Sequence, residues 1–266
     1  MPLFWIFSRQ SFLNLSVYRL NFWSEMFALF VQIFVATTLW NVLYAQAPHI
    51  FGSITLRDMV TYAVIGMILD KILSTDTGPH HYLSEQIKSG MVTNDLLRPI
   101  DFPHHMILRF SGETMARTAF YVVPPAIVAY LLFDLTGPKS VAQFGWFLLS
   151  LVFSWLILFF CNFLFGFISF KTLDLTGFFF TYWAMLRFLS GMLIPIWLYP
   201  DWMQSFINWL PFQLIFYTPL SIYINRFSGD AIWHAVLQQA VWVVVLYAIV
   251  RLLWRRIHRQ LVVQGG

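Results

Sequence analysis

Four stretches of the chain contain no Asp, Glu, Lys or Arg over lengths that can cross a lipid bilayer. They cover residues 26–56, 140–170, 202–225 and 231–250, which is between 20 and 31 residues each. A helix of about 20 apolar residues crosses the roughly 30 Å of hydrocarbon in a membrane. The pattern therefore predicts membrane helices in these four regions.

Two shorter candidates lie between these stretches. The first is an apolar centre over residues 59–69, flanked by charged residues on both sides. The second is charge-free over residues 118–133, and its helix extends back through Arg117, Glu113 and Arg109. Charged side chains at the ends of a span can reach the headgroups, so both candidates are predicted to cross the membrane.

The region 178–227 is too long for one crossing and contains four prolines: Pro195, Pro200, Pro211 and Pro219. Two crossings here would give seven spans and would place the termini on opposite sides. The C-terminal tail carries four arginines and the first 24 residues carry Arg9 and Arg19 without an acid, so both ends read as cytoplasmic. Six spans satisfy both signals. Because proline breaks helices, the surplus is predicted to be a re-entrant helical hairpin between spans five and six.

The predicted fold is thus an all-α integral membrane protein with a single transmembrane domain over residues 1–266. An interfacial helix covers residues 4–21, and a cytoplasmic segment covers residues 75–106. The re-entrant and outer region covers residues 195–228. The six predicted spans are 22–44, 56–74, 107–133, 141–170, 178–194 and 231–254.

Composition supports the membrane interpretation. The chain is 59% hydrophobic and 11% charged, whereas soluble domains carry about 25% charged residues. This excludes a soluble enzyme and a disordered protein, and the single cysteine, Cys161, excludes a disulfide scaffold. The net charge of +4 comes from basic residues that are scattered or at the edges of apolar runs, which favours membrane orientation over nucleic-acid binding.

The cytoplasmic segment contains a short amphipathic helical turn from Glu85 to Ser89, followed by a break at Gly90. Such a helix between two spans suits docking into a groove on a soluble partner, and the alternative is a plain solvated connector. The candidate docking residues are Glu85, Gln86, Ile87, Lys88, Ser89, Gly90 and Met91.

The same segment holds two histidine pairs, His80–His81 and His104–His105. Adjacent histidines on a helix point in different directions, and neither an HExxH motif nor a cysteine pair accompanies them. We therefore predict no metal site.

Charged residues also occur inside the predicted spans. Arg109, Glu113 and Arg117 are four residues apart and share one face of the third helix, and Arg187 lies in the fifth span. Because a charge in the membrane is costly, each should face protein or water. They either line a transport path or form interhelical ion pairs, with Glu25 and Glu113 as candidate partners of Arg187. The ion-pair interpretation is favoured, since intramembrane charges usually pair.

No nucleotide site is visible in the sequence. None of the 13 glycines is followed by lysine, so the GxxxxGK[ST] phosphate loop does not occur, and neither GxSxG nor GxGxxG is present. If ATP drives this protein, the hydrolase must be a separate chain.

Two segments, IKSGMVTNDLLRPIDFP from Ile87 to Pro103 and the proline-containing stretch from Phe188 to Tyr223, together with six spans and an interfacial helix, resemble the ABC type-2 permease family. More narrowly, they resemble its branch of about this chain length in bacterial export systems. The resemblance implies a permease in the bacterial inner membrane that exports an amphipathic, lipid-like or drug-like substrate. It implies two copies of an ATP-binding-cassette ATPase, which carry ATP and Mg, and a second permease that is identical or different. Glu85–Met91 would then be the coupling element.

Two alternatives stay open at this point. An ion-coupled secondary transporter is less favoured because such folds repeat their broken helices in both halves, and only one broken region occurs here. A membrane enzyme acting on lipid would have to use the histidine pairs with Asp76, Asp101 or Glu85, in a spacing that fits no standard metal motif.

Overall fold

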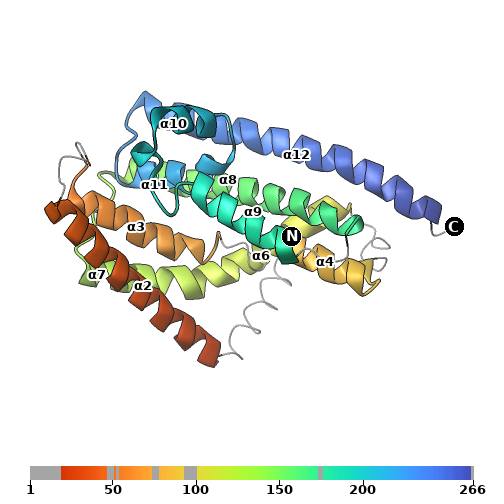
Figure 1. Ribbon diagram of the computed structural model, residues 1–266, viewed down its shortest axis with the longest axis horizontal. Coiled ribbons are helices and arrows are strands. Elements are labelled where there is room, and N and C mark those ends of the chain that lie inside the picture. The colour runs from red at the N-terminus through yellow and green to blue at the C-terminus, as the bar shows by residue number, and fades with distance from the viewer. Residues whose placement is uncertain are drawn as a thin grey trace.

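The computed structural model describes residues 19–46, 51, 54–73, 78–92, 101–172 and 176–264, and every regular element within these ranges is a helix (Figure 1). Of the expected interfacial helix over residues 4–21, only the last three residues are described, and they form the start of α2 (Arg19–Gln46). The all-α expectation is confirmed for the described part of the chain.

Within the described ranges, four helical segments are long and apolar enough to cross a membrane: Phe22–Gln46, Phe102–Leu132, Val141–Phe170 and Asp230–Ile257. They correspond to the predicted spans one, three, four and six. The third begins five residues earlier than expected, since α6 (Phe102–Arg117) starts with Pro103 in its first turn. The fourth combines α8 (Val141–Gly166) with the 3₁₀ helix η3 (Phe167–Phe170), and the last is part of α12 (Asp230–Gln264).

The third span changes its winding halfway. A π-helical segment, η2 (Thr118–Val122), joins α6 to α7 (Val123–Leu132). Pro124 and Pro125 follow at once and have no N–H to donate to the carbonyls four residues earlier. Missing bonds of this kind are a common cause of π-bulges and kinks in a long helix.

The predicted spans two and five are shorter than expected. α3 (Leu56–Asp70) has 15 residues and α9 (Thr176–Leu189) has 14, which gives each about 22 Å or less. α9 ends because Gly191 adopts a φ of +76°, and a Cβ there would lie 2.9 Å from Ile196. The Gly191 carbonyl also accepts a hydrogen bond of 2.7 Å from the Tyr62 hydroxyl of α3. Neither helix alone has the length of a full crossing.

Short helices fill the proline-containing region, namely η4 (Ile196–Leu198), α10 (Asp201–Asn208), η5 (Phe212–Leu214) and α11 (Tyr217–Tyr223). Pro195, Pro200 and Pro211 are the N-cap residues of η4, α10 and η5, and Pro219 is the third residue of α11. Proline suits the start of a helix because the first N–H groups have no helical acceptor. The expected interruptions are therefore present, and each proline lies at or near a new helix start.

α8 lies at the centre of the packing and contacts α4 (Pro79–Lys88), α11 and α12. Its inner face includes Ile157 and Phe163, both fully buried, and also the buried serines Ser150 and Ser154. Gln239 of α12 donates to the Ser154 hydroxyl at 3.1 Å, to the Leu214 carbonyl at 2.9 Å and to the Ser150 carbonyl at 3.2 Å. Side-chain hydrogen bonds between helices are a usual means of association in membranes.

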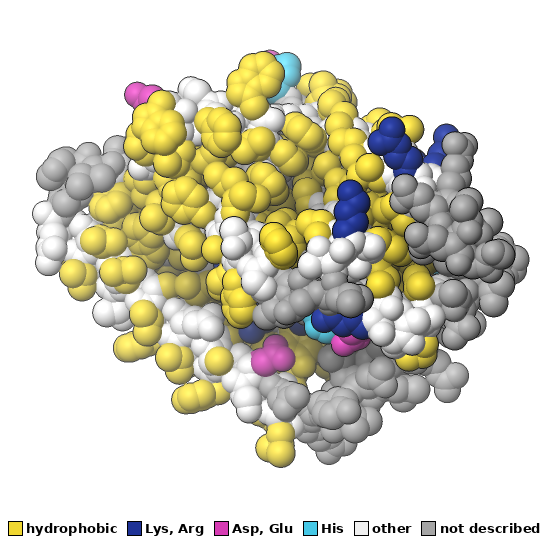
Figure 2. Space-filling view, turned by 45° about the vertical axis from the view of Figure 1, so that its right-hand side comes forward, with side chains coloured by type: hydrophobic (Ala, Val, Ile, Leu, Met, Phe, Trp, Pro, Cys, Tyr) yellow, Lys and Arg dark blue, Asp and Glu magenta, His cyan; other side chains and the backbone are white. Residues whose placement is uncertain are grey.

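Outward-facing side chains are mostly apolar. Figure 2 shows a face dominated by hydrophobic side chains, with Lys and Arg gathered toward its right-hand end. Phe27, Leu131 and Val141 are 72%, 75% and 90% exposed, respectively. An apolar surface of this extent suits contact with lipid rather than water.

Candidate functional site

The segment that the sequence predicts to be cytoplasmic and to dock a partner contains α4. Pro79 occupies the first turn after the N-cap Gly78, the helix ends at Lys88, and Ser89 is its C-cap. Gly90 follows with a φ of +71°, the left-handed conformation that glycine adopts easily after a helix. The helical turn over Glu85–Ser89 and the break at Gly90 are therefore present as the sequence indicated.

The two sides of α4 differ sharply. Pro79, His80 and Leu83 are buried, and α4 packs on α8 and η3. The contact is close, because a Cβ added at Gly166 would lie 2.8 Å from the Cα of His80. The candidate docking residues are on the other side and at the end: Glu85, Lys88, Ser89, Gly90 and Met91 are exposed, and Gln86 and Ile87 are half-buried. α4 thus has one fixed side and one open end.

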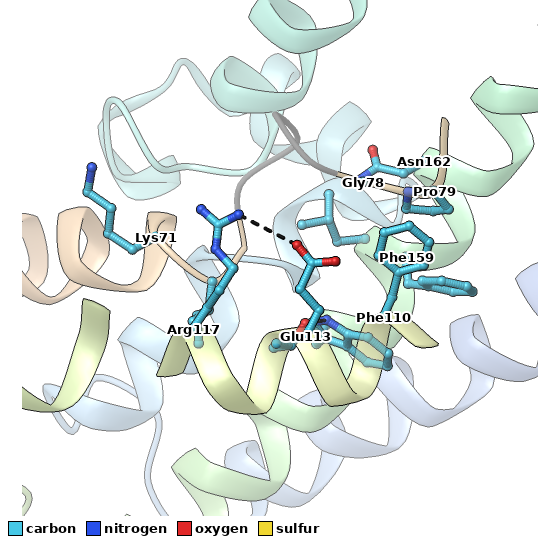
Figure 3. A pocket seen from close by; sticks show the side chains of 12 residues that line it. Lys71, Gly78, Pro79, Phe110, Glu113, Arg117, Phe159 and Asn162 are labelled. Carbon is cyan, nitrogen blue, oxygen red and sulfur yellow. Dashed lines mark hydrogen bonds and ion pairs between the residues drawn. The ribbon is translucent and has the colours of Figure 1, made fainter. Parts of the chain in front are cut away.

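Beside the start of α4 lies a pocket that contains charged groups (Figure 3). It is formed by the end of α3, the start of α4, one side of α6 and the inner part of α8. Its lining residues are Lys71, Ile72, Gly78, Pro79, Phe110, Glu113, Thr114, Arg117, Trp155, Leu158, Phe159 and Asn162. The volume open to the centres of water molecules is about 40 Å³, which is enough for a small number of waters.

Arg117 and Glu113 point toward one another from α6 in this pocket, with 4.0 Å between their charged atoms. Across it, the Trp155 indole donates to Thr114 at 2.8 Å and the Tyr182 hydroxyl donates to Asn162 at 2.7 Å. These bonds tie α6 and α9 to α8. The pocket therefore lies where α4 meets three helices of the membrane domain.

Arg109, the third charged residue of the expected α6 face, has a different contact. Its guanidinium lies over the Tyr82 ring of α4, 4.1 Å from the ring centre. A cation over an aromatic face is attracted by about 0.5–2 kcal/mol, depending on burial. Arg109 therefore links α6 to α4, while Glu113 and Arg117 pair with each other in the pocket.

Arg187 of α9 forms an ion pair with Asp70 at the end of α3 and lies over the Trp183 ring at 4.4 Å. Of the two interpretations from the sequence, the structure contains the interhelical ion pair. The candidate partners were wrong: Glu113 pairs with Arg117, and Glu25 lies 3.8 Å from Lys71. The sequence did not indicate Asp70 as the partner of Arg187, because Asp70 is one of the charged residues that flank a predicted span.

His80 is 3% exposed and stacks on Phe179 with 5.2 Å between the ring centres. Burial, with a smaller contribution from His81, lowers the pKa of His80 to about 4. His81 lies 3.5 Å from Glu85, on the open side of α4.

His104 lies 2.8 Å from Asp101, and Arg251 of α12 contacts the same carboxylate. Burial alone would raise the pKa of Asp101, but hydrogen bonds from His104 and Arg251 outweigh it and hold this pKa below its usual value. The described residues contain no group of three metal-ligating side chains.

Sequence reasoning also missed Lys71, Asn162 and Trp155. Asn162 is a lone amide within a long apolar run, and that was the available signal. Lys71 read as a flanking charge and Trp155 as an ordinary apolar residue, so neither had a distinguishing pattern.

The sequence profile of a family described as ABC-2 family transporter protein matches residues 13–265. The chain belongs to this family. It is therefore a multi-pass membrane permease of an ABC transporter, a transport subunit that works with an ATP-binding-cassette ATPase. The resemblance stated from the sequence is confirmed over nearly the whole permease. No curated protein matches the chain.

Proposed function

We propose that this permease exports an amphipathic, lipid-like or drug-like substrate across the bacterial inner membrane and that its ATPase binds the open end of α4. The observation that carries the proposal is the asymmetry of α4. One side is fixed on α8, whereas Glu85, Lys88 and Met91 are exposed at the other side and the end. A short helix held in this way can be displaced by a bound partner and transmit that displacement to the membrane domain.

The contacts of α4 with α6 and α8 determine which helices this displacement would reach. His80 and Leu83 contact α8 through the close approach at Gly166, and Tyr82 lies under Arg109 of α6. Packed interiors are dense and deform little, so a displaced α4 moves its neighbours rather than compressing against them. Closure of two ATPase subunits would shift α6 and α8 as rigid elements.

A six-span arrangement with both termini cytoplasmic is part of the proposal, with residues 195–228 as the re-entrant outer region. Two contacts along α12 support it: Gln238 bonds to the Asn208 carbonyl of α10, and Arg251 pairs with Asp101 at the start of α6. The 13 residues between them span about 20 Å. α10 and the start of α6, which follows the α4 segment, therefore contact α12 at well-separated positions along its axis.

ATP and Mg would be bound by two copies of the ATPase, and this chain would supply no cofactor. A second permease, identical or different, would complete the translocation pathway between the two membrane domains. In this arrangement the role of the chain is to bind the ATPase and to change the shape of the pathway.

Binding at α4 is tested by copurifying the permease with its ATPase. We expect Met91→Glu to weaken the complex about tenfold, as loss of one buried interface anchor does. The control Ser205→Glu lies on α10, is also exposed, and should bind as the unchanged permease does. Equal affinity for both variants would contradict the proposed docking site.

Orientation is tested in intact cells with a maleimide that cannot cross the membrane. In a Cys161→Ser background, a cysteine at Ser205 should be labelled and one at Ser89 should be labelled only after the cells are opened. Labelling of the Ser89 position in intact cells would contradict both the topology and the ATPase site.

A further inference from the structure

An apolar groove lies between α2 and α7, away from the α4 surface, and residues of the charged pocket lie near one of its ends. Its volume is about 300 Å³, twice the roughly 150 Å³ of an apolar cavity that binds benzene. Its lining residues are apolar and include Phe22, Met26 and Ile33 of α2, Pro125 and Val128 of α7, and Phe133 directly after α7.

The groove lies beside the π-helical segment and the two prolines of the third span. The Phe22 ring lies 5.3 Å from the Tyr121 ring of η2, and the Phe30 ring lies 6.0 Å from the ring of Phe133, which follows α7, so α2 contacts the third span on both sides of Pro124 and Pro125. Between these contacts, Pro124 and Pro125 present short side chains toward α2 and leave space. The same prolines that disturb the winding of the third span therefore form the floor of the groove.

One end of the groove carries charged groups. Glu25 of α2 lies 3.8 Å from Lys71, and the guanidinium of Arg117 lies 5.8 Å from the Tyr121 ring that touches Phe22. With Glu113, 4.0 Å from Arg117, these residues form a cluster of two acids and two bases. Direct charged hydrogen bonds are about 2.7–2.9 Å long, so both ion pairs are looser than a direct charged hydrogen bond.

The dimensions match one leaflet of a membrane. From Glu25 to Ile33 the helix rises about 12 Å, close to the roughly 15 Å of hydrocarbon on one side of the bilayer. Trp23, beside Glu25, is 68% exposed, and an aromatic of this type commonly lies at headgroup level. An apolar groove of this length beside a polar cluster matches the acyl chain and the headgroup of a phospholipid.

We propose that the groove between α2 and α7 holds one acyl chain of an aminophospholipid whose phosphate lies by Lys71 and Arg117 and whose ammonium donates to Glu25. The cluster has no net charge, which fits a zwitterionic headgroup, whereas an acidic headgroup would meet two carboxylates without an ammonium. A quaternary ammonium has no N–H to donate, so phosphatidylethanolamine fits Glu25 better than phosphatidylcholine does.

The site goes beyond the proposed transport function, because it concerns a resident lipid that bridges the first and third spans. Among the described residues, α2 packs mainly on α3, and its ring contacts with the third span are at Tyr121 and Phe133. A lipid chain in the groove would complete the contact between α2 and α7.

The test uses the full permease in phosphatidylcholine nanodiscs that contain a minor amount of a lipid with a photoactivatable acyl chain. Labelled residues are located by mass spectrometry, for probes with ethanolamine, choline or glycerol headgroups. We expect label on α2 and α7 groove residues, with about five- to tenfold more from the ethanolamine probe, equivalent to about 1–1.4 kcal/mol.

Two variants, each with a control, test the headgroup site and the acyl-chain groove separately. Glu25→Gln should remove the preference for ethanolamine over choline, and Asp201→Asn at the other end of the bundle should retain it. Val128→Trp should fill the groove and reduce its labelling with every probe, whereas Leu131→Trp on the neighbouring exposed side should not. Val128 is 46% exposed and Leu131 is 75% exposed, so both positions accept a larger side chain.

Equal labelling by all three headgroups would mean ordinary annular lipid and would overturn the proposal. Absence of groove label with every probe would mean that another part of the protein covers the groove and would also overturn it. Neither result bears on the α4 experiments, so failure of this proposal is distinguishable from failure of the proposed transport function.

Discussion

The Arg187–Asp70 pair joins α9 to the end of α3, and its removal should be costly. Both side chains are mostly buried, with 22% and 21% exposure. At an effective dielectric constant of about 20, two unit charges about 4 Å apart attract by about 4 kcal/mol. Loss of one partner forfeits this attraction and leaves the other charge in a poor environment. We therefore expect Arg187→Gln to lower the free energy of unfolding by about 2–4 kcal/mol.

The double variant Arg187→Gln with Asp70→Asn should recover most of this loss, because no unpaired charge remains. The coupling between the two positions is then measured by a double-mutant cycle, with unfolding followed by circular dichroism in mixed detergent micelles. We expect the two single variants to sum to much more than the double variant.

The matched control is Arg57 with Asp134, an ion pair of 2.8 Å between two exposed side chains. Exposed pairs contribute about 0–1 kcal/mol, so Arg57→Gln should have little effect. If Arg187→Gln is as mild as Arg57→Gln, or if the double variant is as unstable as the sum of the single ones, then the α3–α9 ion pair does not stabilise the fold as argued.

The packing of α4 and α8 leads to three further predictions, each measured as a change in the free energy of unfolding. Gly166→Leu should cost about 2–4 kcal/mol and reduce ATPase stimulation, because its Cβ would meet the His80 backbone. The control Gly145→Leu faces open space and should be neutral. A small effect of Gly166→Leu would contradict the close contact. Gln239→Leu should cost about 1–3 kcal/mol because it removes the donor to three buried oxygens. The control Gln238→Leu, at a half-buried residue with one bond to the Asn208 carbonyl, should cost less than about 1 kcal/mol, and equal costs would refute this. The His80 side chain binds a proton less readily in the folded protein, so its contribution to stability is complete above pH 6.5 and is lost as the pH falls toward 4. Between pH 7 and pH 5 the free energy of unfolding should therefore fall by about 2 kcal/mol. His80→Phe should abolish this pH dependence, and His81→Phe should not.

The long spans were predictable because their signal is local. A run of 20 to 31 residues without a charge is typical of a membrane helix and rare elsewhere, and α2, α8 and α12 follow such runs. The start and end of α4 were equally local, because Pro79 and Gly90 determine them through backbone conformation alone. The family could be stated from two segments for the same reason, since it rests on the order of residues and not on contacts.

What the sequence could not provide depends on contacts between distant residues. Asp70 and Arg187 are 117 positions apart, so their spacing has no periodic signal. α9 stops at Leu189 because Gly191 packs against Ile196 and is bonded by Tyr62. The charged pocket combines residues of α3, α4, α6 and α8. Each of these features appears only after the chain has folded, when the helices have neighbours.

α8 connects the two ends of the membrane domain. Near its C-terminal end, Gly166 contacts the backbone of α4, and near its middle the hydroxyl of Ser154 donates to the Leu214 carbonyl of η5. The 12 residues between them span about 18 Å of continuous helix. Because a straight helix transmits a displacement along its axis with little compression, a push on α4 would reach the proline-containing region through α8. Gly166→Leu and Ser154→Ala should then both reduce transport, with ATPase binding retained. Transport that is unchanged in both variants, measured as substrate movement into vesicles, would show that coupling follows another route.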